Sequence, residues 1–215
     1  MNKPLPLVLI GGGGHASVLA DILLGQGREI LAIICPDDIS TRTVFAGIPH
    51  FTQNNDITRF NSDSVLLVNG IGMVPRSNLR RRVNKIFLEL GYQFETVIAS
   101  DANVSVFAEI KSGVQILPGA RVQTGAIIAE HTIVNSGALI EHDCRIGAHN
   151  HIAPHATLCG DVLTLEEVYI GANATIIQGL VLESQSIVGA GAILTQSLMK
   201  SRTCYPARAH IKENK

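Results

Sequence analysis

Two adjacent residues in the middle of the chain, His142 and Asp143, have the types and spacing that proton transfer requires. A carboxylate beside an imidazole fixes the tautomer of the ring and raises its basicity, which is what a general base in acyl transfer needs. Four more histidines lie nearby, namely His131, His149, His151 and His155. For all of these except His151, the simplest interpretation is a polar side chain on a solvated surface.

The residues around this pair repeat with a period of six. From Ile98 to Leu194, sixteen of the seventeen residues found at every sixth position are branched aliphatics, and Thr164 is the exception. Four positions after each of these sites the residue is usually small, as at Ala102 and Cys144. This period predicts a parallel β-helix, in which three short strands form each eighteen-residue coil.

The eighteen-residue coil also predicts a neighbour for His142. Gly160 follows it by eighteen positions and therefore lies on the same face of the next coil, at about the 4.8 Å spacing of adjacent strands. A glycine lets a ligand approach the backbone, and its N–H could donate to a developing oxyanion. An ordinary turn glycine is the alternative interpretation.

The N-terminal part has a different pattern, in which short aliphatic runs alternate with segments of helical period. The runs predict strands at Leu7–Ile10, Ile30–Ile34 and Val65–Val68, a helix at Val18–Leu24 and a second helix with Leu79, Val83, Ile86 and Leu90 on one face. This alternation is typical of a parallel α/β sheet. We therefore expect two domains, a Rossmann-like domain over residues 1–95 and the β-helix over residues 96–215.

A glycine-rich turn follows the first strand. Gly11-x-Gly13-x-x-Ala16 resembles a dinucleotide fingerprint, and Asp37 or Asp38, some 25 residues further on, could bind a ribose hydroxyl. Because the domain is long enough for only one mononucleotide half, we expect the helix N-terminus and backbone N–H groups to meet a diphosphate. We expect the basic residues 80–82 to form a solvated helix face.

Composition excludes several partners. Lys and Arg total 17 against 18 for Asp and Glu, which gives no field for holding nucleic acid or an anionic membrane. No apolar run approaches the roughly 20 residues of a membrane span. The four cysteines form no CxxC pair, which argues against a zinc ribbon or a disulfide scaffold. We expect a cytoplasmic protein whose partners are small molecules or its own copies.

Several segments together resemble a known family, the bacterial hexapeptide-repeat sugar acyltransferases, which include nucleotide-amino-sugar N-acetyltransferases and sialic acid O-acetyltransferases. These segments are Ile10-Gly-Gly-Gly-Gly-His-Ala16, Gly47-Ile-Pro49, Asn69-Gly-Ile-Gly72, Ile140-Glu-His-Asp-Cys-Arg-Ile-Gly147, His151-Ile-Ala-Pro-His-Ala-Thr-Leu-Cys-Gly-Asp-Val162 and Pro206-Ala-Arg208. The sequence departs from the family pattern at residues 100–102, 163–167 and 204–205.

The resemblance implies a left-handed β-helix, a homotrimer with active sites between subunits, and acetyl-CoA as co-substrate, with no metal. The acceptor would be a UDP- or dTDP-linked amino sugar of surface glycan biosynthesis, acetylated at nitrogen. His142 would be the base, Asp143 its orienting group and Gly160 the oxyanion donor. Implied acetyl-CoA contacts are His151, Gly160, Ala190 and Arg208, and implied acceptor contacts are Gly11, Gly13, Gly14, His15, Asp37, Asp38, Asn69, Gly70 and Asn135.

Three other functions remain open from the sequence. O-acetylation of sialic acid or a related sugar uses the same chemistry on a different acceptor. A metal-dependent β-helix hydratase of the carbonic anhydrase kind would use the clustered histidines as ligands, for example His149, His151 and His155, or His131 stacked on His149. A scaffold or nucleotide-binding regulator without catalysis would release no thiol from acetyl-CoA.

Overall fold

The structure is a computed structural model that describes residues 4–207. Within them, a parallel sheet in the order β3-β2-β1-β4 comes first. Its strands are β1 (Leu7–Ile10), β2 (Ile30–Ile34), β3 (His50–Phe51) and β4 (Leu66–Asn69). The three strands expected from aliphatic runs are confirmed, the last with a shift of one residue. The two-residue β3 is too short to leave a pattern in the sequence.

Two helices cover opposite faces of this sheet. α1 (Gly14–Gly25) packs on Leu7 and Leu9, whereas α2 (Leu79–Glu89) packs on Val8 and Ile10, because successive side chains of β1 point to opposite faces. Two 3-10 turns, η1 (Thr43–Phe45) and η2 (Asn54–Arg59), lie in the connection from β2 to β4.

The buried face of α2 differs from the one we expected. Of the four expected residues, Val83 is buried, whereas Leu79, Ile86 and Leu90 are exposed. Arg80, Asn84 and Phe87 are buried together with Val83. The prediction that Arg80 lies on a solvated face is therefore wrong. The physical reason is the end of β4, where Asn69 bonds to both polar residues: its carbonyl accepts from Arg80 Nη1, and its amide donates to Asn84 Oδ1.

The rest of the described chain is a left-handed parallel β-helix with three faces. Residues eighteen apart pair, except between β20 and β22, where residues sixteen apart pair. Face 1 contains β5 (Val97–Ile98), β8 (Gln115–Ile116), β11 (Ile133–Val134), β14 (His151–Ile152), β17 (Tyr169–Ile170), β20 (Ile187–Val188) and β22 (Thr203–Cys204). Face 2 contains β6 (Asn103–Val104), β9 (Arg121–Val122), β12 (Leu139–Ile140), β15 (Thr157–Leu158), β18 (Thr175–Ile176) and β21 (Ile193–Leu194). Face 3 contains β7 (Glu109–Ile110), β10 (Ile127–Ile128), β13 (Arg145–Ile146), β16 (Leu163–Thr164) and β19 (Val181–Leu182).

The interior of the β-helix is the six-residue lattice expected from the sequence. Its aliphatic positions and the small residues four places later form one continuous core. Thr164 also points inward and is 1% exposed, and its hydroxyl bonds to the amide of Asn150 and accepts from the N–H of Gly147 at 3.1 Å. The departure from the family pattern at residues 163–167 therefore leaves the coil intact.

The three corners of each coil require an unusual backbone. Every sixth residue from Gly113 to Gly191 has a positive φ, a conformation in which glycine, asparagine, aspartate and histidine are enriched. The non-glycine residues at these positions are His131, Asp143, His149, His155, Asp161, Glu167, Asn173 and Gln185. Three of the clustered histidines thus occupy the positive-φ position of a corner, whereas His142 and His151 do not.

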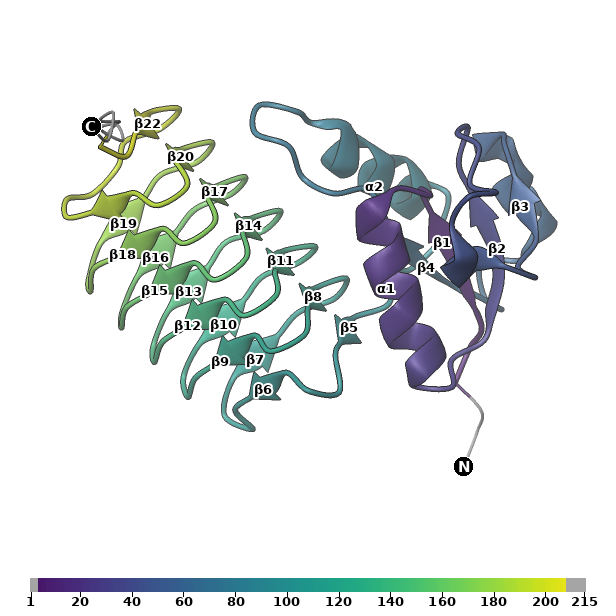
Figure 1. Cartoon of the computed structure of the whole chain (residues 1–215), viewed down its shortest axis with the longest axis horizontal. Coiled ribbons are helices and arrows are strands. Elements are labelled where there is room, and N and C mark those ends of the chain that lie inside the picture. The colour runs from purple at the N-terminus through teal and green to yellow at the C-terminus, as the bar shows by residue number, and fades with distance from the viewer. Residues whose placement is uncertain (1–3, 208–215) are drawn as a thin grey trace, which may run out of the picture.

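We name the corners by the faces they join. The N-terminal unit rests on face 1 and on the 3–1 corner (residues 113, 131, 149, 167 and 185), where Phe94 contacts the ring of His131 edge to face. α1 packs on Val97, Leu117 and Ile133 of face 1. Figure 1 shows this unit beside the first coils, with α2 and the loop before it next to the row of face 1 strands. The domain division at residue 95 stays a prediction.

Among residues 4–207, no helix is long and apolar enough to cross a membrane.

Candidate functional site

The His142–Asp143 pair lies on the 2–3 corner, between β12 and β13. His142 Nδ1 is 2.8 Å from Asp143 Oδ2, so the carboxylate accepts the Nδ1 proton and leaves the lone pair on Nε2. The positive φ of Asp143 turns the chain here, and the Asp143 carboxylate lies over Gly125, one coil earlier. Both side chains are more than half exposed in the single chain.

The pKa of His142 is raised above its ordinary value. The hydrogen bond to Asp143 is the largest cause, and the negative charges of Asp143, Glu141 and Asp161 act in the same direction. Carboxylates around an imidazole favour its protonated form and make it a stronger base. The pair therefore has the electrostatics of a general base.

Gly160 lies directly beside the ring of His142. A Cβ at position 160 would come within 2.6 Å of His142 Cε1 and 2.7 Å of Nε2, so only glycine leaves room for the imidazole. In residues 4–207 we find no protein acceptor for the Gly160 N–H. A base and a free backbone donor are thus neighbours, as the eighteen-residue spacing predicts.

A second feature is a cavity of about 480 Å³ at the carboxyl ends of β1, β2 and β4. It is lined by residues that include Gly11, Gly13, Gly14, His15, Asp37 and Gly70 from the predicted acceptor site. α1 begins here without a side-chain cap or an acidic residue in its first turn, so its N–H groups are available to an anion. Gly70 is required because a Cβ there would lie 2.6 Å from Ala16 Cβ.

Three predicted acceptor contacts lie elsewhere. Asn69 is 2% exposed behind the cavity, where its Oδ1 accepts from the N–H of Ile71 and so shapes the turn. Asp38 lines a separate hollow, and its Oδ1 accepts from the N–H of Ser40. Asn135 is on the β-helix, and its amide nitrogen is 3.2 Å from His151 Nε2.

His151 lies in the buried part of face 1. Burial lowers its pKa to about 3, with smaller contributions from His15 and Arg80, so the ring is neutral. Because the side-chain Oδ1 of Asn135 accepts from the N–H of Ser136, the side-chain Nδ2 faces His151 and donates to its Nε2. The proton of the neutral His151 ring is therefore on Nδ1. This buried Nδ1 has no protein partner among the described residues.

The remaining predicted acetyl-CoA contacts are scattered. Ala190 is exposed on the 1–2 corner, where its backbone packs against Gly171, and it is not on the corner that carries His142. Arg208 lies outside the described residues.

The expectation of solvated histidines is correct for His155 and wrong for His131 and His149. His131 is 6% exposed, and its ring stacks on that of His149 with centroids 5.1 Å apart. Burial lowers the pKa of His131 to about 4 and that of His149 below its ordinary value. The N-terminal unit buries His131 and partly covers His149, which the six-residue period alone does not reveal. In residues 4–207 no three His, Cys, Asp or Glu side chains could together hold a metal ion.

Sequence reasoning missed Gln115 and Arg80. Gln115 is 1% exposed on β8 and bonds to both His15 and the carbonyl of Asn69, while Arg80 is buried between the two units. The sequence feature that could have pointed to Gln115 is a glutamine at an outward strand position on the coil nearest the N-terminal unit. This feature indicates a buried contact only once it is known that the N-terminal unit covers face 1.

The nucleotide-type cavity and His142 are on opposite sides of one chain. The N-terminal unit contacts face 1, and the 2–3 corner lies across the triangular coil from that face. The cavity and the His142–Asp143 pair therefore do not meet within one chain.

A hexapeptide β-helix with a His–Asp pair on one corner, joined to a mononucleotide-type α/β unit, is the arrangement expected from the resemblance to hexapeptide-repeat sugar acetyltransferases. Comparisons with known proteins confirm this resemblance. Residues 6–87 match the family model described as the PglD N-terminal domain. The structure of PerB from Caulobacter crescentus, in complex with CoA and GDP-perosamine, gives a TM-score of 0.84 at 28% identity, with 97% of each chain covered.

Two further relatives agree. The acetyltransferase domain of PglB from Neisseria gonorrhoeae, in complex with acetyl coenzyme A, gives a TM-score of 0.83 at 28% identity and covers 96% of this chain and 99% of that one. GDP-perosamine N-acetyltransferase of Escherichia coli O157:H7 is 31% identical over 118 residues. That match covers 55% of this chain and 53% of the relative, so the chain spans about half the length of the curated relative.

Proposed function

We propose that the protein transfers an acetyl group from acetyl-CoA to the amine of a nucleotide-linked amino sugar. The observation that carries this proposal is the imidazole of His142, held by Asp143 at 2.8 Å and lying beside the free N–H of Gly160. The cavity at the N-terminus of α1 accounts for the nucleotide diphosphate.

The proposed reaction needs no covalent enzyme intermediate. His142 Nε2 removes a proton from the attacking amine, whose nitrogen forms a bond to the thioester carbonyl carbon. The N–H of Gly160 donates to the oxyanion of the tetrahedral intermediate. The C–S bond then breaks, coenzyme A leaves as a thiolate, and the proton on Nε2 passes to the thiolate or to solvent.

Because the cavity and the His142–Asp143 pair lie on opposite sides of one chain, we propose that the active site forms between copies. The 2–3 corner of one copy would face the cavity and face 1 of the next, where His15, Asn135 and His151 lie. A head-to-tail contact closes into a ring when the rotation between copies returns to the first copy, and a homotrimer is the ring that the resemblance implies. His151 and Ala190 would contact acetyl-CoA within it.

The acceptor also has a nucleotide base, which differs among the candidate amino sugars. UDP or dTDP is what the resemblance implies, and the names of two relatives specify GDP-perosamine. Asp37 lines the cavity at the end of β2, where it can accept from ribose hydroxyls whatever the base. We expect the reaction in the cytoplasm, where acetyl-CoA and nucleotide sugars are available.

A substrate panel tests the reaction class. The protein is mixed with acetyl-CoA and with GDP-, UDP- or dTDP-linked amino sugars, or with free sialic acid, and released thiol is measured. We expect thiol release with at least one nucleotide amino sugar and none with sialic acid. Thiol release with sialic acid alone would show O-acetylation. If none of the acceptors causes thiol release, the proposal is overturned.

Mixed oligomers test the shared site. His142→Ala removes the base, and Gly13→Glu places a carboxylate where a Cβ meets no atom within 4 Å, so it repels a diphosphate without steric conflict. Each variant alone should be inactive. Unfolding and refolding the two together should restore activity if a site takes His142 from one copy and the cavity from another. No recovery in verified mixed oligomers would place the whole site in one chain.

A further inference from the structure

A buried glutamine, Gln115, lies between the N-terminal unit and the β-helix. Gln115 projects from β8 on face 1 and is 1% exposed. Its Oε1 is 2.8 Å from His15 Nε2, and its Nε2 donates to the carbonyl of Asn69 at 2.9 Å. The residue therefore joins the β-helix to two walls of the nucleotide-type cavity, the first turn of α1 and the end of β4.

The carbonyl of Asn69 fixes the orientation of the Gln115 amide. A carbonyl oxygen can only accept, so the amide nitrogen of Gln115 must face it and the amide oxygen must face His15. An oxygen acceptor facing His15 Nε2 requires that this ring nitrogen carry the proton. The neutral ring of His15 therefore has its lone pair on Nδ1.

His15 stays neutral near pH 7. Burial lowers its pKa to about 4, the charge of Arg80 on α2 acts in the same direction, and the bond to Gln115 opposes them. The other titratable group facing it is His151 on β14, whose pKa is about 3 and which is also neutral. His15 lines the cavity at its β-helix end, and its Nδ1 has no protein partner among residues 4–207.

We propose that Gln115 is a positioning residue, which fixes the Nε2–H tautomer of His15 and so makes His15 Nδ1 accept an N–H of the amine of the bound sugar. This inference rests on the proposed function. The β-helix end of the cavity is where the sugar must lie if acyl transfer occurs at the β-helix. A neutral acceptor at this place holds the amine through one N–H, while the lone pair of the amine nitrogen remains free to attack.

Two variants separate this role from simple packing. Gln115→Met keeps the length of the side chain and removes both hydrogen bonds. Gln115→Glu accepts from His15 but cannot donate to Asn69, and its charge favours an imidazolium with N–H on both nitrogens. Gln26→Met is the matched control, because Gln26 also joins the two units, donating to the carbonyl of Ile98 at 2.7 Å, without reaching the cavity.

The first measurement is the nitrogen-15 spectrum of the imidazoles in the free protein, with His15 assigned from a His15→Asn spectrum. We expect the Nε2–H tautomer in the native protein and a mixture of tautomers in Gln115→Met. In Gln115→Glu we expect His15 to titrate at a higher pH. An Nδ1–H tautomer in the native protein would overturn the proposal without use of any variant or substrate.

The second measurement is binding of the amino-sugar nucleotide that is acetylated fastest, compared with the matching nucleoside diphosphate. Gln115→Met should raise the Kd of the sugar nucleotide about tenfold and that of the diphosphate less than threefold, since one hydrogen bond to the amine is lost. Gln115→Glu should bind the sugar nucleotide poorly near pH 7 and better as the pH rises. Gln26→Met should bind both normally.

Equal weakening of both ligands in Gln115→Met would show a structural role alone and overturn the proposal. If none of the tested acceptors causes thiol release, the proposed function is wrong instead, and the sugar amine is then no longer the expected ligand of His15. The tautomer of His15 in the free protein still decides whether Gln115 controls the ring, so the two failures are distinguishable.

Discussion

The 2–3 and 3–1 corners of the β-helix place histidines in opposite environments. His142 on the 2–3 corner is exposed and bonded to Asp143, and its pKa is raised. His131 on the 3–1 corner is buried against Phe94, and its pKa is lowered to about 4. One ring has the properties of a base, whereas the other is a neutral packing group.

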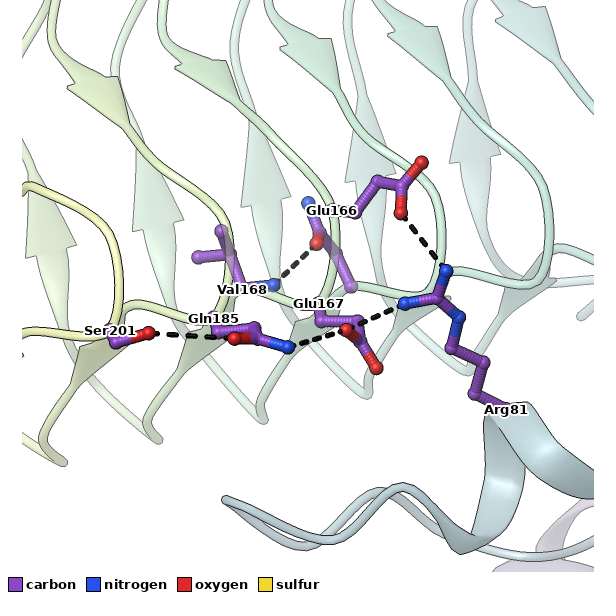
Figure 2. Close-up of polar contacts among 7 residues, drawn as sticks. Arg81, Glu166, Glu167, Val168, Gln185 and Ser201 are labelled. Atoms are coloured by element: carbon purple, nitrogen blue, oxygen red, sulfur yellow. Dashed lines mark hydrogen bonds and ion pairs between the residues drawn. The ribbon is translucent and has the colours of Figure 1, made fainter.

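The two histidines differ in environment for two reasons, their position within the six-residue repeat and the part of the chain that covers each corner. His131 and His149 occupy the position of positive φ, where histidine is tolerated for backbone reasons, and His142 precedes that position. The N-terminal unit then covers the 3–1 corner. Figure 2 shows Arg81 of α2 reaching the carboxylates of Glu166 and Glu167. The contacts continue along the corner from Glu167 to Gln185 and Ser201.

The largest expected effect is that of removing the base. His142→Ala should lower kcat by about 10²- to 10⁴-fold, the usual contribution of a positioned proton acceptor, with folding unchanged because the side chain is exposed. The measurement is thiol release from acetyl-CoA. His155→Asn, an exposed corner histidine changed to another residue that accepts positive φ, should be nearly normal. A similar loss of kcat in both variants would show that His142 does not differ in function from the other exposed histidine, His155.

Gly160→Ala should have the next largest effect, a loss in kcat of about 10²-fold. The added Cβ collides with His142 and displaces the ring from the free N–H. Gly160 has an ordinary φ, so the backbone tolerates alanine and the melting temperature should change little. Gly25→Ala at the end of α1, where a Cβ meets no atom within 4 Å, is the control. A fully active Gly160→Ala would contradict the placement of the ring.

Asp143→Asn should lower activity, by less than His142→Ala does, and change its pH dependence, because the carboxylate makes His142 a stronger base. The carboxylate raises the pKa of His142, so the neutral base is lost as the pH falls through that raised value. Without the carboxylate, the acidic limb of kcat/KM against pH should move to lower pH. An unmoved limb would show that Asp143 does not control the base.

The smallest effect on activity is expected from His131→Asn, which should be normal near pH 7. The effect appears in stability. With a pKa of about 4 when folded and 6.5 as its ordinary value, His131 takes up its proton more readily in the unfolded chain. Stability is therefore lost as the pH falls from about 6.5 to 4, and the variant should show a shallower loss in thermal unfolding. An identical slope would mean that His131 is not buried in solution.

Local pattern was enough to predict the repeating parts of the molecule. The inward residues from Ile98 to Leu194, the pairing of residues eighteen apart and the place of Gly160 beside His142 all follow from the period. Strands β1, β2 and β4 followed from aliphatic runs. In each case the relevant contact lies within one element or between adjacent coils, so sequence spacing fixes it.

Contacts between the two units could not be predicted in this way. Arg80 and Asn84 are buried because the end of β4 supplies their partners, and His131 is buried because Phe94 covers it. Gln115 is one hundred residues from His15, and no local pattern connects them. The site residues that sequence reasoning missed are those that only the docking of the units brings together.

Chemical rescue tests the catalytic assignment most directly. Because His142 is on an exposed corner beside Gly160, His142→Ala leaves a space that free imidazole can enter. The measurement is thiol release by this variant with acetyl-CoA and an amino-sugar nucleotide, as imidazole is added at several pH values. We predict that activity returns in proportion to the neutral imidazole present. Ordinary activity of the variant without imidazole would contradict the assignment of His142 as the base.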